Sequence, residues 1–420
     1  MKNLIEVKGL IVLSLFVCFT NCVESQTNFI YGKQFGSDKD CVAFNPVTDR
    51  YGNVYIAGST EGALAGQSFG KTDGFAAKFD STGKTIWTKQ FGTREDDIIN
   101  WITLDLAGNV YVTGCTNGVF GEKSFGKEDI IVAKFDTNGN IEWQKQFGSD
   151  STDVGNVVYA DNRGDVYVSG ATKGTMDKLS FGGADCVILT LDSKGNVLRK
   201  KQFGTPKGDE CQGITGEGSD IYICGYTFGD LAARNKGSLD AFIGKFNDKG
   251  EEVKLFQFGT DKIDMASHIA VDKEKNIYIG GTTAGDFNGK SLGEGDCFLS
   301  KFNSNFEIIW TQQFGTDKWD GINGIALNEK ISGNIVVSGC QHWPSCQSFI
   351  RMYTNDGSLL WGDNFTANGK NGGTCGKGVC IDDMGSIYHC GNTGGSLFKS
   401  IEKPEGHDVI LIKLSMCGSN

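Results

Sequence analysis

The sequence predicts an all-β protein in which one unit of four antiparallel strands is repeated around a ring. The first observation behind this prediction is the tripeptide Gln-Phe-Gly, which returns every 55 or 56 residues. Its copies begin at Gln34, Gln90, Gln146, Gln202, Gln257 and Gln313. A degenerate copy, Asn364-Phe365-Thr366, follows the last of them. A fixed period of this length indicates one supersecondary unit used many times.

The second observation is the composition. Glycine accounts for 60 of the 420 residues and proline for only 4. Because average glycine usage is about 7%, this excess is typical of short strands joined by tight turns, in which glycine takes positive φ. The repeat runs along the chain without a linker, so we expect a single domain over residues 26–420.

The unit between Gly92 and Gly148 shows the four strands in order. We expect the first strand over residues 98–105 and the second over 110–114, because both segments are rich in β-branched and aromatic residues. A long loop leads to the third strand, 130–135, and a hairpin turn leads to the fourth, 141–147. Segments such as 110–112 and 130–133 are apolar on both faces, whereas the strands of a half-exposed sheet would alternate.

Sheets covered on both faces are expected when four-stranded blades pack side by side in a β-propeller. The alternative is a β-solenoid, but its rungs are shorter than this repeat, at roughly 20 to 30 residues. The second-strand and third-strand signatures each occur seven times, which predicts seven blades.

The fourth strand of the last blade is predicted to come from the N-terminal end of the domain. Only six fourth strands follow a third strand, yet residues 29–36 match the fourth-strand pattern with nothing of the unit before them. We therefore expect this segment to complete blade seven, which closes the ring and removes an exposed sheet edge.

The best copies of the unit also resemble a known family. Residues 105–114, 129–136 and 139–148 are similar to the SBBP, or beta-propeller repeat, family. The resemblance implies a secreted or surface β-propeller and carries over no catalytic residue. Four tryptophans share one place in the fourth strand, where we expect them to pack one blade on the next: Trp87, Trp143, Trp310 and Trp361.

The N-terminal 25 residues are predicted to be a signal peptide. Lys2 and Lys8 precede an apolar run, residues 10–19, that is too short to span a bilayer. We expect a secreted monomer without a transmembrane segment, with lipid anchoring at the cell surface through Cys22 as the alternative. The net charge of −11 argues against a nucleic-acid partner and suits a protein or glycan ligand of basic character.

A repeated acidic residue is the first candidate for a binding site. It lies five residues after each repeat glycine, where the first strand of a blade reaches the channel: Asp97, Asp153, Asp209, Asp264 and Asp320. A ring of carboxylates could hold a hard cation such as calcium. The alternative, which we prefer, is that each aspartate caps its own loop by accepting backbone N–H hydrogen bonds.

Departures from the repeat point to blades six and seven. There the sequence places His342, Trp343 and His389 on the same face of the ring as the aspartates. Four cysteines of these blades are candidates for disulfides, because secretion favours oxidation: Cys340, Cys346, Cys375 and Cys390. A zinc or copper site built from these histidines and cysteines is the less favoured interpretation.

The sequence contains no Gly-x-Ser-x-Gly, His-Glu-x-x-His or phosphate-loop motif, and no Ser–His pairing is evident. We therefore predict no catalytic residue, no metal site and no cofactor other than the calcium considered above. The favoured function is a binding or scaffolding module with its ligand near blades six and seven. We expect the ligand on the face of the ring that carries the repeated aspartates, which we call the top face. The alternative is an enzyme with a metal- or cofactor-assisted site at the top mouth of the channel.

Overall fold

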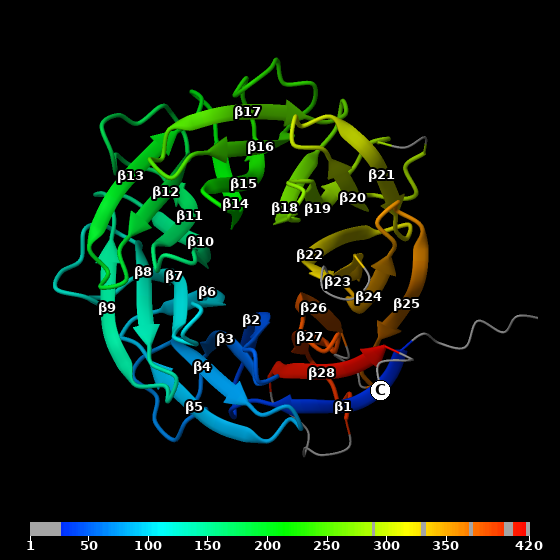
Figure 1. The fold of residues 1–420 in the computed structure, drawn as a ribbon. Coiled ribbons are helices and arrows are strands. Elements are labelled where there is room, and N and C mark those ends of the chain that lie inside the picture. The colour runs from blue at the N-terminus through cyan, green and yellow to red at the C-terminus, as the bar shows by residue number, and fades with distance from the viewer. Residues whose placement is uncertain (1–26, 288–289, 329–332, 369–372, 399–405, 417–420) are drawn as a thin grey trace, which may run out of the picture.

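The computed structural model is a closed ring of seven four-stranded antiparallel sheets (Figure 1). The structure describes residues 27–287, 290–328, 333–368, 373–398 and 406–416. The predicted signal peptide and its alternative at Cys22 lie outside these residues. No helix within the described ranges is long and apolar enough to cross a lipid bilayer.

The predicted order of strands within a blade is confirmed. The innermost strands are β2 (Cys41–Thr48), β6 (Asp97–Leu104), β10 (Asp153–Ala160), β14 (Asp209–Glu217), β18 (Asp264–Val271), β22 (Trp319–Asn328) and β26 (Thr374–Ile381). The second strands are β3 (Val54–Thr60), β7 (Val110–Thr116), β11 (Val166–Thr172), β15 (Asp220–Thr227), β19 (Ile277–Thr283), β23 (Asn334–Trp343) and β27 (Ile387–Thr393).

The outer half of each blade follows the same rule. The third strands are β4 (Asp73–Phe79), β8 (Asp129–Phe135), β12 (Asp185–Leu191), β16 (Asp240–Phe246), β20 (Asp296–Phe302), β24 (Gln347–Tyr353) and β28 (Asp408–Met416). The outermost strands are β5 (Thr85–Phe91), β9 (Ile141–Phe147), β13 (Val197–Phe203), β17 (Glu252–Phe258), β21 (Ile308–Phe314), β25 (Leu359–Phe365) and β1 (Thr27–Phe35). The first six of these belong to blades one to six, and β1 belongs to blade seven.

Strand β1 closes the ring as predicted. It pairs antiparallel with β28, so the seventh sheet has the order β1-β28-β27-β26. In Figure 1 the two strands lie side by side, although they come from opposite ends of the chain. The Gln34 side chain adds a polar contact, because its Nε2 donates to Asp408 Oδ2 at 2.9 Å.

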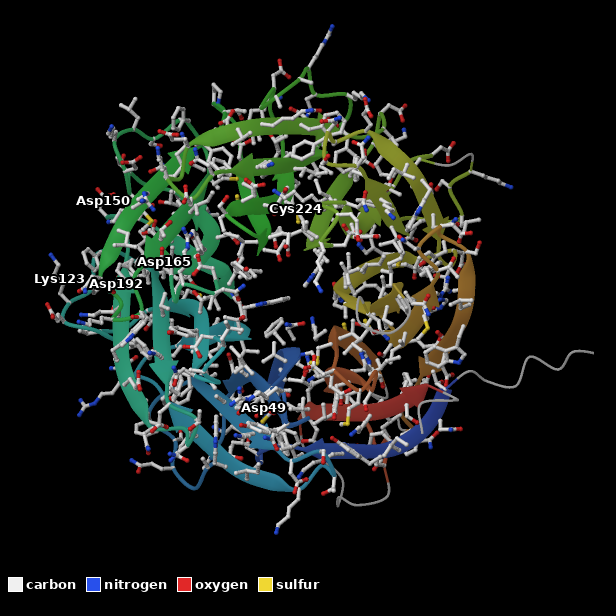
Figure 2. The ribbon with its side chains drawn as sticks, in the orientation of Figure 1. Asp49, Lys123, Asp150, Asp165, Asp192 and Cys224 are labelled. Carbon is white, nitrogen blue, oxygen red and sulfur yellow. The ribbon has the colours of Figure 1, made fainter. Side chains whose placement is uncertain are left out.

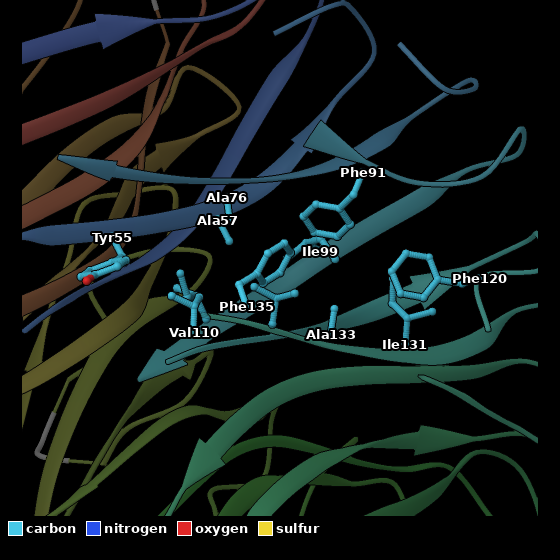
Figure 3. Packing of buried hydrophobic residues seen from close by; sticks show 12 residues of the cluster. Tyr55, Ala57, Ala76, Phe91, Ile99, Val110, Phe120, Ile131, Ala133 and Phe135 are labelled. Carbon is cyan, nitrogen blue, oxygen red and sulfur yellow. The ribbon is translucent and has the colours of Figure 1, made fainter. Parts of the chain in front are cut away.

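The core lies between neighbouring blades. The cluster in Figure 3 joins blade one to blade two, with Ala57 and Ala76 on one side and Ile131 and Phe135 on the other. Figure 2 shows side chains along the blades, with Cys224 among the strands and Lys123 at the outer edge of the ring. Each second and third strand is thereby covered on both faces, which is why those strands do not alternate in polarity.

The repeated Gln-Phe-Gly fixes the loop between the second and third strands. In blade two, Gln146 Nε2 donates to Asp129 Oδ2 at 2.7 Å and to the Gly118 carbonyl at 3.0 Å. Its Oε1 accepts the Phe120 N–H at 2.7 Å. The same pattern recurs at Gln90, Gln202, Gln257 and Gln313. The glutamine is therefore a structural residue of the blade.

The repeated tryptophan joins neighbouring blades, as predicted. Trp87 Nε1 donates to the Thr137 carbonyl at 3.2 Å, and its ring lies against Gly139 in the hairpin turn of the next blade. Gly139 has a φ of 79°, and a Cβ there would lie 2.9 Å from the Trp87 ring. Trp143 and Trp310 make the same hydrogen bond to the blade that follows each of them.

Candidate functional site

The five repeated aspartates are buried inside the blades. Their exposed fraction is 0% in every case. Asp97 accepts hydrogen bonds from the Thr93 N–H, from Thr93 Oγ1 at 2.9 Å and from Thr116 Oγ1 at 2.6 Å. Burial raises the pKa of Asp97, as it also does for Asp153 and Asp264. These hydrogen bonds are the ones expected if each aspartate caps its own loop. The alternative, a ring of carboxylates that holds a cation, stays a prediction.

Asp320 differs from the other four because it holds the hairpin of blade six. In blade two the Asp97 carboxylate accepts a hydrogen bond from Thr116 at the end of the second strand. The equivalent residue in the second strand of blade six is Gln341. Asp320 Oδ1 instead accepts the His342 N–H at 2.7 Å. Strand β23 extends to 10 residues, so the hairpin that it forms with β24, with residues 342–346 at its tip, runs past the end of the ordinary blade.

The tip of this hairpin carries two of the predicted site residues. His342 has a φ of 65°, which is uncommon for a residue other than glycine. Trp343 is 60% exposed, the most exposed tryptophan among the described residues. Residues held in such a conformation cluster at binding and catalytic sites. Both His342 and Trp343 are exposed, so the two residues lie on an accessible surface.

His389, predicted as a binding residue, does not lie on that surface. It is 0% exposed, and burial lowers its pKa to about 4. Its Nε2 lies 2.7 Å from Ser348 Oγ and its Nδ1 lies 3.1 Å from the Gly378 carbonyl. Sequence reasoning missed this Ser–His pair because its members belong to different blades. Both residues are fully buried, so the pair joins blades six and seven and meets no substrate.

Three of the four candidate disulfide cysteines come together at the junction of blades six and seven. The sulfur atoms of Cys340, Cys346 and Cys375 all lie within 4.8 Å of one another. Cys390 lies apart from them, in the buried cluster between blades seven and one. All eleven cysteines within the described residues are free thiols in this structure.

The three thiols affect one another's ionisation. Hydrogen bonds from the Cys340 and Cys346 thiols, together with the Lys377 ammonium, lower the pKa of Cys375 below its usual value. The hydrogen bonds to Cys346 and Cys375 raise the pKa of Cys340 well above its usual value. Of these sulfurs, Cys375 is therefore the one that loses its proton most readily.

A polar collar inside the channel was not predicted. In six innermost strands a β-bulge displaces one residue, and that residue lines a central cavity of 250 Å³. These residues are Asn100, Asn156, Gln212, Ser267, Asn323 and Lys377, with Phe44 at the equivalent place in blade one. Each lies three residues after the first-strand aspartate or its replacement, so the repeat itself was the signal that could have found them.

The collar is mostly structural. Asn100 Nδ2 donates to the Gly155 carbonyl of the next blade at 3.0 Å, and Asn156 and Asn323 make the same link. Trp101 and His268 pack with their ring centroids 4.8 Å apart. Lys377 is the one cation of the collar, and its Nζ lies 5.5 Å from the centre of the Phe44 ring.

Comparison with known proteins supports the repeat. Two stretches of the chain match the SBBP beta-propeller repeat. They are residues 86–121 and 257–288. The first begins in β5 and runs through β6 and β7, so the match to the SBBP repeat covers the crossing from one blade to the next.

A curated relative of the chain is the regulatory protein FlaEY of Caulobacter vibrioides. The two are 22% identical over 354 residues, which is 73% of this chain and 37% of FlaEY. The chain thus spans little more than a third of the relative that it matches.

Among solved structures, a polysaccharide lyase of the PL25 ulvan lyase family superposes with a TM-score of 0.50 at 12% identity. That match covers 89% of this chain and 97% of the lyase. Sqt1 from Chaetomium thermophilum gives a TM-score of 0.49 at 12% identity, over 94% and 100% of the two chains. At this identity the likeness to the lyase shows the fold alone.

Proposed function

We propose that the protein is an exported binding module that holds a protein or glycan ligand on the top face of its ring, at the hairpin of blade six. The observation that carries the proposal is the exposed Trp343 on an extended hairpin whose tip is fixed by Asp320. A rigid, exposed aromatic side chain offers a large contact area at low entropic cost, and such residues are common at the centres of interfaces.

The surroundings of Trp343 favour a basic or neutral ligand. His342 Nδ1 lies 3.8 Å from Asp317 Oδ1, and Asp317 is largely exposed. The chain as a whole carries a net charge of −11. Because like charges repel at an interface, these groups disfavour a strongly anionic partner. The regular blades repeat one another in sequence. The residues that make blade six different are therefore the ones that can give a ligand site its specificity.

The test is a binding screen of the folded protein against neutral, anionic and amino-sugar polysaccharides and against immobilised basic and acidic proteins. For a ligand found in this way, the substitution Trp343→Ala should weaken binding by about 30-fold, the loss expected at the centre of an interface. Phe125→Ala is the matched control, since Phe125 is an exposed aromatic residue in a loop of blade two. Equal binding by the Trp343→Ala variant and the parent would contradict the proposal.

A further inference from the structure

The thiol group of Cys340, Cys346 and Cys375 lies next to two positions at which the regular blades carry carboxylates. The third strand of the other six blades begins with an aspartate, but β24 begins with Gln347. The first strand of blades two to six carries an aspartate at the place that Thr374 takes in blade seven. Both replacements are neutral, and both are satisfied by neutral partners. Gln347 Nε2 donates to Thr366 Oγ1 at 2.6 Å, and Thr374 Oγ1 lies 3.4 Å from Thr393 Oγ1.

The one collar cation lies beside the same thiols. Lys377 follows Cys375 by two residues in β26, so the chain places a cation in the strand that carries one of the three thiols. The chain therefore removes two negative charges from this junction and adds a positive one. A cluster of several sulfur anions requires such surroundings, because unpaired buried charge is costly.

The arrangement of the sulfurs suits a single ion. Three sulfurs about 2.3 Å from one ion, at the corners of a triangle, are about 4.0 Å apart. The sulfurs of Cys340, Cys346 and Cys375 lie within 4.8 Å of one another, so small rotations bring them to that spacing. Cys340 and Cys346 are 9% and 6% exposed, while Cys375 is partly exposed and leaves a path for the ion.

The donor set discriminates between metals. His389 has both ring nitrogens in hydrogen bonds, and among the described residues no histidine, aspartate or glutamate joins the three cysteines as a fourth ligand. Structural zinc sites are tetrahedral and close with four protein ligands. Soft thiolates select monovalent copper, which accepts three sulfur ligands in one plane.

We propose that Cys340, Cys346 and Cys375 form a trigonal site for monovalent copper or an ion of the same thiophilic class. The site is independent of the Trp343 surface, and it needs no reaction beyond the release of thiol protons as the ion binds. It also explains why blade six lacks the long loop and the Gln–Asp contact of the other blades. The metal ties the short loop before β24 to blade seven instead.

The experiment titrates the reduced, full-length chain with Cu(I) in competition with a chromophoric Cu(I) chelator, without oxygen. The parent should retain one Cu(I) per chain, and X-ray absorption should show three sulfur neighbours. Cys375→Ser and Cys346→Ser should each weaken this binding at least 100-fold. Cys115→Ser is the matched control, because Cys115 takes the place of Cys340 in blade two and lies beside Glu128. That variant should bind Cu(I) within twofold of the parent.

A second variant tests the electrostatic argument without touching a thiol. Thr374→Asp restores the carboxylate of the regular blades and should weaken Cu(I) binding at least tenfold. Should Cys375→Ser fail to fold, Cys346→Ser carries the test, since Cys346 lies in the loop before β24. Cu(I) binding by the cysteine variants equal to that of the parent would overturn the proposal. So would tight zinc binding without Cu(I) binding, or a disulfide between two of the three cysteines in protein isolated without reductant.

Discussion

Asp97 shows how a repeated acidic residue can belong to the fold. Its carboxylate accepts three hydrogen bonds from Thr93 and Thr116, which ties the loop from the previous blade to the start of β6 and to the end of β7. The repeat could predict the position of this residue but not its burial. Only the packing of two blades decides whether a carboxylate at the start of the strand points into the channel or into the sheet.

The substitution Asp97→Ala should lower the free energy of unfolding by about 3 kcal/mol, because it leaves buried donors without an acceptor. Asp97→Asn should cost less than about 1 kcal/mol, since an amide can accept from Thr93 and donate to Thr116 Oγ1. Urea unfolding at pH 7 measures both values. Equal losses for the two variants would show that the hydrogen bonds are not what Asp97 contributes.

The pH dependence of this effect has a fixed sign. Burial raises the pKa of Asp97 above 3.8, so the folded state binds its proton more tightly than the unfolded state does. Its contribution to stability is therefore fully present below pH 3.8 and is lost as the pH rises through the raised folded value. The free energy of unfolding of the Asp97→Asn variant, relative to that of the parent, should therefore be higher at pH 7 than at pH 4. The opposite order in urea titrations at the two pH values would contradict the burial argument.

At the scale of the strand and loop, the glutamine of Gln-Phe-Gly explains the period of the sequence. Gln146 binds the first residue of the third strand and the loop that precedes it, and so holds three segments of blade two together. The sequence predicted that blade six would differ, because Asn364-Phe365-Thr366 replaces the Gln-Phe-Gly tripeptide there. The structure shows the reason, because Asn364 is exposed and faces no aspartate at the start of β24.

The same substitution should therefore have different effects in two blades. Gln146→Ala should lower the free energy of unfolding by about 3 kcal/mol, because it leaves Asp129 and the Phe120 N–H without their partner. Asn364→Ala, at the equivalent place in blade six, should change it by less than about 0.5 kcal/mol, as is usual for exposed positions. Denaturant titrations of the two variants measure the difference. Comparable losses at both positions would contradict the structural role given to the repeat.

At the scale of the whole molecule, the fold was predictable from the sequence, and the arrangement of the candidate site residues was predictable only in part. Blade number, strand order and ring closure follow from local patterns that repeat, so each copy supports the others. His342 and Trp343 could be found because they break the pattern. The grouping of Cys340, Cys346 and Cys375 could not, because it depends on how the loop of blade six meets the first strand of blade seven. A contact that occurs at a single junction between blades leaves no repeated signal in the sequence.

Ring closure by β1 is the central claim, since this strand completes the sheet of blade seven with a segment from the other end of the chain. Strand β1 pairs with β28 from Thr27 to Phe35, and Gln34 reaches Asp408 and Leu397 across the blade. A chain that begins at Ser37 would leave β28 as an open edge, which pairs readily with other chains. The substitution Gln34→Ala gives a milder control, because it keeps the strand and removes only these side-chain contacts.

The direct measurement is thermal unfolding together with size-exclusion chromatography of the parent, the Gln34→Ala variant and the chain that begins at Ser37. We predict that the shortened chain unfolds at a lower temperature than both other proteins and elutes as self-associated species. A shortened chain that stays monomeric and unfolds at the temperature of the parent would contradict closure by β1.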